Sequence, residues 1–189
     1  MGTEQNNINI EHGGKVIGRD DNSVNVFFSP GTQNKLSNLF SALKDKFEKQ
    51  EQTDIICEEL IYYKTERDTI GLQQKLIDGN LDYLYDDASF LKEIYAKKLY
   101  KYQFYEPAQQ IYVYILSIIC SKFSYLIYPL LRKKVDQETI FSIISKEIVD
   151  PILHIIQEYG CNDIMGLTAN DIDGMIYFLT GRCHIKWKL

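Results

Sequence analysis

The sequence predicts a mainly α-helical protein, a helical bundle preceded by a short N-terminal β hairpin. Between residues 32 and 181, apolar side chains recur every three or four positions, which is the spacing of helices that bury one face. Residues 6–28 instead alternate polar and apolar side chains, as half-buried strands do. The 189 residues are 45% hydrophobic and 25% charged, the composition of a globular protein. We therefore expect a β segment at 1–30 and one helical domain at 31–189.

The N-terminal segment predicts two or three short strands. Asn7–Ile10 and Ser23–Phe27 carry the alternation, and the glycines at positions 13 and 14 mark a turn between them. Because an isolated hairpin is only marginally stable in water, these strands should pack on the helices or pair with another copy of the chain. A homo-oligomer is therefore expected, and its candidate contact residues are Val16, Ile17, Val24, Val26 and Phe28.

The helical part divides at capping residues, glycines and prolines. Thr32 and Asp136 are placed to cap helices, and Gly79 to end one. Pro107 suits the first turn of the helix that follows residues 81–102, whereas Pro151 predicts a kink or break inside a later helix. The expected helices begin near residues 32, 53, 68, 81, 106, 136 and 168.

One apolar stretch, Ile111–Leu131, has the length of a membrane span. It carries Lys122 near its centre, where a lysine costs about 3 kcal/mol on insertion. We therefore expect a buried core helix and no membrane contact. The N-terminus lacks the pattern of a signal peptide, so we expect a cytoplasmic protein with reduced cysteines. These are Cys57, Cys120, Cys161 and Cys183.

The sequence contains no strong catalytic or metal motif, and we expect no cofactor and no metal. A metal site made of Cys161, Cys183 and His184 is a less favoured alternative to a packed C-terminus. Cys183 and His184 are neighbours whose side chains diverge, so adjacency does not make them a catalytic dyad. Asp171 and Asp173 could act as acids or metal ligands, but such pairs are more typical of a helix surface or N-terminus. A small hydrolase is therefore an alternative to a non-enzymatic protein.

A basic stretch with interleaved tyrosines occupies the helix expected at residues 81–102. Lysines beside aromatic side chains can contact a nucleic-acid backbone, although the net charge of −5 opposes nonspecific binding. The second alternative is therefore a self-assembling helical protein that contacts nucleic acid through Lys97, Lys98 and Lys101.

The C-terminal run reads as a helix that ends at Gly181, followed by a short extended tail. Alternation places Cys183, Ile185 and Trp187 on one side of this tail. Trp187, the only tryptophan, is expected to anchor the tail in the bundle.

This run resembles the C-terminal domains of the ABC-three-component systems, a group of prokaryotic conflict and antiphage systems that includes Lamassu-like loci. Gly174–Gly181, Cys183–Ile185 and Trp187 carry the resemblance, and weaker pieces such as Gly71–Leu76 extend it over about residues 54–188. Such systems pair an SMC-like ABC ATPase and a middle component with an effector. The resemblance implies that the helical domain couples the effector to the ATPase.

The resemblance implies an adaptor or assembly subunit. In many members a nuclease or another effector domain precedes this domain, whereas about 30 residues precede it here. The expected partners are thus an SMC-like ABC ATPase and an effector on another chain. The candidate family-motif and partner-binding residues are Gly174, Met175, Tyr177, Phe178, Thr180, Gly181, Cys183, His184 and Trp187.

Overall fold

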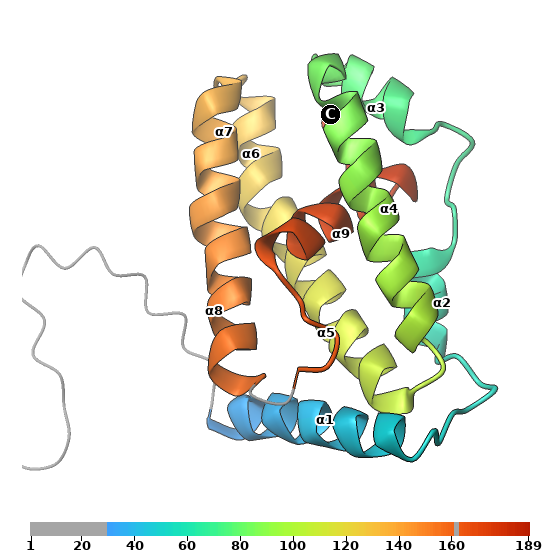
Figure 1. The fold of residues 1–189 in the computed structure, drawn as a ribbon. Helices are drawn as coiled ribbons and strands as arrows, with labels where there is room; N and C mark the ends of the chain where they lie inside the picture. The colour runs from blue at the N-terminus through green and yellow to red at the C-terminus, as the bar shows by residue number, and fades with distance from the viewer. Residues whose placement is uncertain (1–29, 161–162) are drawn as a thin grey trace, which may run out of the picture.

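The computed structural model describes residues 30–160 and 163–189, which fold into a bundle of helices (Figure 1). These two ranges contain no strand. The mainly helical fold predicted from the sequence is therefore confirmed. The predicted N-terminal β hairpin lies outside the described residues, as do its candidate oligomerisation residues Val16, Ile17, Val24, Val26 and Phe28.

The chain follows the predicted order of helices, but two predicted starts are wrong. The first helix begins at Pro30, so Thr32 lies inside it and is not its cap, and the third begins at Leu72 and not at residue 68. A 3₁₀ turn at Asp82–Leu84 leads into α4, and π-helical segments at Phe123–Ile127 and Ser145–Val149 join α5 to α6 and α7 to α8. The α-helices are α1 (Pro30–Glu48), α2 (Glu58–Lys64), α3 (Leu72–Asp78), α4 (Tyr85–Tyr102), α5 (Glu106–Lys122), α6 (Tyr128–Arg132), α7 (Gln137–Ile144), α8 (Asp150–Tyr159) and α9 (Ala169–Gly181).

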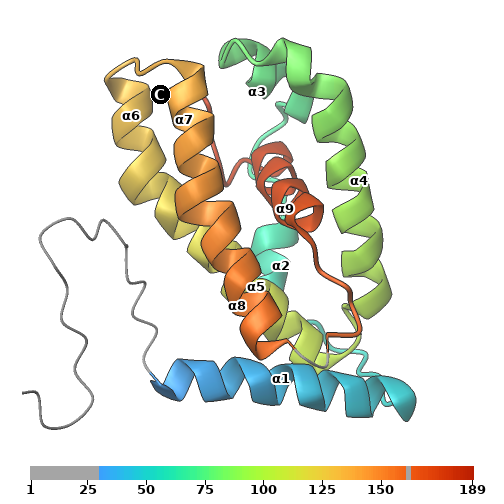
Figure 2. The ribbon, with the colours of Figure 1, turned by 60° about the vertical axis from the view of Figure 1, so that its left-hand side comes forward.

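Helix α9, near the end of the chain, lies at the centre of the bundle. Figures 1 and 2 show α4 on one side of α9, the α7–α8 rod on the other, and α1 across one end of the bundle. Helix α9 contacts α3, α4, α5 and α8, while α1 contacts α5 and α8. Most residues of α9 are buried, so this helix forms the middle of the hydrophobic core.

Two long helical runs, α5–α6 and α7–α8, each contain a π-helical segment shortly before a proline. Phe123–Ile127 precedes Pro129, and Ser145–Val149 precedes Pro151. A proline has no N–H to donate, and its ring clashes with the carbonyl one turn earlier. A wider π-helical turn at that point avoids the clash. The break predicted at Pro151 thus takes the form of a π segment, and the backbone stays helical from α7 through α8.

The second helix begins later than predicted, at Glu58 instead of residue 53 or 54. The side-chain amide of Gln109, only 2% exposed, explains the difference. Its Nε2 donates to the carbonyl of Ile55 and its Oε1 accepts from the backbone N–H of Cys57, both at 2.8 Å. These long-range bonds satisfy backbone groups that a helix would otherwise use, so residues 53–57 stay non-helical.

The apolar rod Glu106–Arg132 is long and hydrophobic enough to cross a membrane, and 39% of its apolar window is buried inside the protein. Its buried side chains lie on one helical face, which includes Ile111, Ile115 and Ile119. That face contributes to the common core. The opposite face is half-buried or exposed, as at Tyr125, which is 77% exposed.

Candidate partner-binding surface

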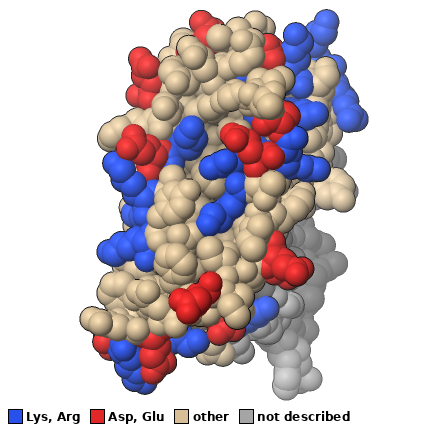
Figure 3. Space-filling model, turned by 90° about the vertical axis from the view of Figure 1, so that its right-hand side faces the viewer, with Lys and Arg blue, Asp and Glu red and all other residues tan. Residues whose placement is uncertain are grey.

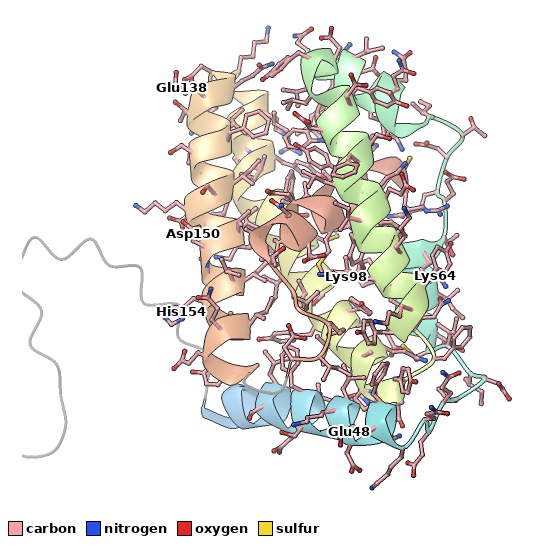
Figure 4. All side chains as sticks on the ribbon, viewed as in Figure 1. Glu48, Lys64, Lys98, Glu138, Asp150 and His154 are labelled. Carbon is pink, nitrogen blue, oxygen red and sulfur yellow. The ribbon has the colours of Figure 1, made fainter. Side chains whose placement is uncertain are left out.

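The start of α9 is held by a buried carboxylate. Asp171 is 1% exposed, and its Oδ2 accepts hydrogen bonds from the N–H and the hydroxyl of Thr168, each at 2.8 Å. Lys98 of α4 donates to the same oxygen at 2.8 Å and to the carbonyl of Gly166 at 2.6 Å. Figure 4 shows Lys98 between α4 and the segment that leads into α9. The predicted start of the last helix near Thr168 is confirmed, and a capping box produces it.

The end of α9 is held by a buried lysine from α3. Lys75, 8% exposed, donates from Nζ to the carbonyls of Thr180 and Gly181 at 2.9 and 3.1 Å. These carbonyls end the helix, where its dipole favours a positive charge. Asp68 lies 3.6 Å from the same ammonium and partly balances its charge.

Gly174 sets how closely α4 and α9 approach each other. A Cβ at this position would lie 2.4 Å from the carbonyl oxygen of Leu91 and 2.9 Å from the Cβ of Tyr95. Next to this contact, the rings of Tyr95 and Phe178 meet edge to face, with centroids 5.2 Å apart. The glycine is therefore needed for packing between the two helices.

The C-terminal tail is docked in the bundle, as predicted, but it begins with a turn and not as an extended segment: Cys183 has a φ of +65° and its N–H donates to the carbonyl of Thr180. Cys183, Ile185 and Trp187 are buried, whereas Lys186 is exposed. The indole Nε1 of Trp187 donates to the hydroxyl of Thr180 at 3.1 Å. Two further aromatic rings, from α7 and from the segment after α5, lie against the indole with centroids 5.8 and 5.5 Å away.

His184 lies on the other side of the tail, against two tyrosines. Its ring centroid is 4.9 Å from that of Tyr62 and 5.5 Å from that of Tyr63. Burial, together with the nearby charge of Arg67, lowers the pKa of His184 below its usual value. Its Nε2 is buried and has no hydrogen-bond partner among the residues described. These surroundings favour the neutral form of the imidazole.

Cys183 and His184 contact different parts of the molecule. The thiol of Cys183 lies 4.0 Å from the carbonyl of Ile70, on the α3 side of the tail. Burial raises the pKa of this thiol, which favours the less reactive protonated form. Within residues 30–160 and 163–189, no group of three or more His, Cys, Asp or Glu side chains has the geometry to hold a metal ion.

A groove with a volume of about 420 Å³ opens between α9, the α7–α8 rod and the 3₁₀ turn before α4. Its walls include the rings of Phe141, Tyr177 and Trp187 and the carboxylates of Asp150 and Asp173. Among the described residues that line it, none is a lysine or an arginine. We call this feature the acidic groove.

Burial perturbs two titratable groups that line the acidic groove, Asp173 and Tyr177. Burial raises the pKa of Asp173, and burial together with the charges of Asp173 and Asp87 raises the pKa of Tyr177 to about 12. No described residue forms a hydrogen bond or an ion pair with the Asp173 carboxylate. A positive charge in the groove would stabilise the ionised form of the Asp173 carboxylate.

Most of the nine motif residues belong to the protein interior. Gly174, Met175, Phe178, Thr180, Gly181, Cys183 and Trp187 are buried. Tyr177 and His184 are partly exposed, and Tyr177 lines the acidic groove together with Trp187. The structure thus brings a part of the motif to a surface that a partner can reach, while the remainder holds α9 in place.

The lysines considered for nucleic-acid binding do not form a separate basic patch. Lys98 is engaged with Asp171 inside the protein, and Lys97 pairs with Glu93 at 2.8 Å. The ammonium of Lys101 lies over an aromatic ring of its own helix, 4.8 Å from the centroid. Figure 3 shows basic and acidic side chains interspersed on the face that includes α4. Such a surface lacks the continuous positive charge that backbone binding requires.

Sequence patterns did not reveal the acidic groove. The sequence indicates Asp173 only as a partner of Asp171, in an acid pair, a metal site or a helix surface, and it assigns no role to Asp150. The two aspartates are 23 positions apart in the sequence and line one groove because α8 packs beside α9. The one available signal was an aspartate in a helix whose other positions are largely apolar.

Comparison with known proteins identifies the family. A family model described as C-terminal domain 9 of the ABC-three component (ABC-3C) systems matches residues 71–187. The match covers more than half of the chain, including α3 to α9 and most of the tail. No curated protein and no solved structure matches the chain. The chain therefore belongs to the family of C-terminal domain 9 of the ABC-three component systems.

Proposed function

We propose that this chain is a non-enzymatic adaptor or assembly subunit of an antiphage system, and that it couples an SMC-like ABC ATPase to an effector chain. The acidic groove is the observation that carries the proposal. It is a preformed surface on the central helix of the family domain, with apolar walls and carboxylates that described residues leave unpaired. A partner protein can bury such walls and neutralise such carboxylates.

The polar groups of α9 support binding over catalysis. Asp171 and Thr180 take part in bonds that hold the helix and the tail, as does Lys75 from α3. Burial favours the protonated thiol of Cys183 and the neutral imidazole of His184, and the two side chains contact different neighbours. A nucleophile and its base need instead to lie within hydrogen-bond reach of each other.

The test is purification of the tagged chain, expressed together with the other genes of its own locus. The eluate is treated with a nuclease, so that nucleic acid cannot bridge the proteins, and the mass of each complex is measured. We expect an SMC-like ABC ATPase and an effector to co-elute with the chain at a fixed stoichiometry. Elution of the chain alone, or only as multiples of 22.1 kDa, would contradict the proposal and favour self-assembly.

A further inference from the structure

The acidic groove has two carboxylates on different walls and lacks a basic group to balance them. Asp150 begins α8 and Asp173 belongs to α9, so the two helices bring their charges to one space. No lysine or arginine is present among the described lining residues. A cation that pairs with these carboxylates would therefore come from outside the described residues that line the groove.

The walls of the acidic groove suit a long side chain with an apolar stem and a planar charged end. Ile144, Val149 and Ile176 supply aliphatic surface, which can cover methylene groups. The rings of Tyr177 and Phe141 supply faces on which a guanidinium can stack. The volume of about 420 Å³ lies within the range of sites that hold small ligands, about 300–1,000 Å³.

We propose that the acidic groove receives an arginine side chain of a partner protein, with apolar residues of the partner on either side of it. An arginine fits better than a lysine, because its planar guanidinium can pair with a carboxylate through two N–H groups and can also lie against an aromatic ring. This inference rests on the proposed adaptor function and names the chemistry of the partner. The raised pKa of Asp173 is consistent with it, since a bound cation would stabilise the ionised carboxylate.

Trp187 provides a direct probe, because it is the only tryptophan and it lines the acidic groove. The ¹⁵N-labelled chain is titrated with the peptide acetyl-Leu-Arg-Leu-amide, and the indole N–H signal is followed by NMR. The matched probe carries citrulline, the neutral isostere of arginine. We expect a saturable shift with the arginine peptide and binding at least about tenfold weaker with citrulline. No shift, or equal shifts with both peptides, would overturn the proposal.

Two charge-removing variants show whether the binding depends on the groove. Asp173→Asn removes a groove carboxylate and preserves its shape, whereas Asp54→Asn removes an exposed carboxylate of the loop before α2. Asp173→Asn should weaken arginine-peptide binding at least about tenfold, and Asp54→Asn should leave it unchanged. An unshifted indole signal in the free variants confirms that the fold is intact. Equal effects of the two variants would contradict a groove-specific site.

The same variants, introduced into the co-expressed complex, separate this inference from the proposed function. Loss of the co-eluting partner with Asp173→Asn but not with Asp54→Asn supports both. A complex that forms equally well with Asp173→Asn leaves the adaptor function standing and overturns the arginine site. Peptide binding by a chain that recruits no partner supports the site and contradicts the adaptor function.

Discussion

Replacing Gly174 by alanine tests the close approach of α4 and α9. In an open helix this change would stabilise the protein by about 1 kcal/mol, since alanine is the better helix former. Here the new Cβ would lie 2.4 Å from the carbonyl oxygen of Leu91, whereas ordinary contact begins at 3.4 Å. Helix α4 would have to retreat by about 1 Å along a tightly packed interface.

The expected net result is a loss of stability. Overpacking of this kind costs about 1–3 kcal/mol, and a carbonyl of the helix backbone yields less easily than a side chain. After the gain in helix propensity, we expect Gly174→Ala to lower the free energy of unfolding by about 2 kcal/mol. For a chain of this size, this corresponds to a fall in Tm of about 4–8 °C.

Gly181→Ala is the matched control, because it places the same methyl group in the same helix. Its nearest atoms would be the Cδ of Lys92 at 3.7 Å and the Cβ of Leu72 at 4.0 Å, which are ordinary contacts. We expect this variant to be unchanged or more stable by about 0.4–1 kcal/mol. The assay is urea unfolding followed by far-UV circular dichroism. A Gly174→Ala protein as stable as Gly181→Ala would refute the packing argument.

Three further changes test the bonds around α9 and its tail. Lys98→Met should lower the free energy of unfolding by about 3 kcal/mol, because it leaves the buried charge of Asp171 without its cation. Lys97→Met breaks only an exposed pair and should cost less than about 1 kcal/mol when measured by the same urea unfolding. Trp187→Ala should cost about 3–5 kcal/mol by removing a buried ring, and a stability within 1 kcal/mol of wild type would contradict the docked tail. Burial lowers the pKa of His184 in the folded protein. As pH falls through about 6.5, the imidazole is therefore protonated in the unfolded chain before it is protonated in the folded one, and the free energy of unfolding should decrease below that pH. Thermal unfolding at a series of pH values should show a smaller decrease for His184→Gln, and equal slopes would argue against a buried neutral imidazole.

Local patterns predicted the helical elements well. The capping residue Asp136 begins α7, and its carboxylate accepts from the N–H of Thr139 at 2.8 Å. Asn80, with φ of +57°, follows the end of α3 next to Gly79, as expected. The alternation in the tail correctly predicted that Trp187 would be buried. All of these depend on residues within a few positions of one another.

Interactions between distant residues explain what the patterns missed. The later start of α2 depends on Gln109, more than fifty positions away. Lys98 belongs by sequence to a basic helix surface, yet its ammonium lies in an ion pair with buried Asp171. Lys75 similarly has no sequence feature that marks it as the residue that caps α9. In each case the partner is known only once the helices are packed.

The sequence by itself determined the helical class, most helix boundaries, the docked tail and the family, because each depends on a local spacing or a contiguous motif. Tertiary structure decided that α9 lies at the centre, that Gly174 sets its distance from α4, and that Asp150 and Asp173 share one groove. The physical reason is that helical periodicity specifies which face of a helix is apolar but not which other helix covers it. Close packing among α4, α8 and α9 settles that choice and thereby creates the charged surface proposed to bind a partner.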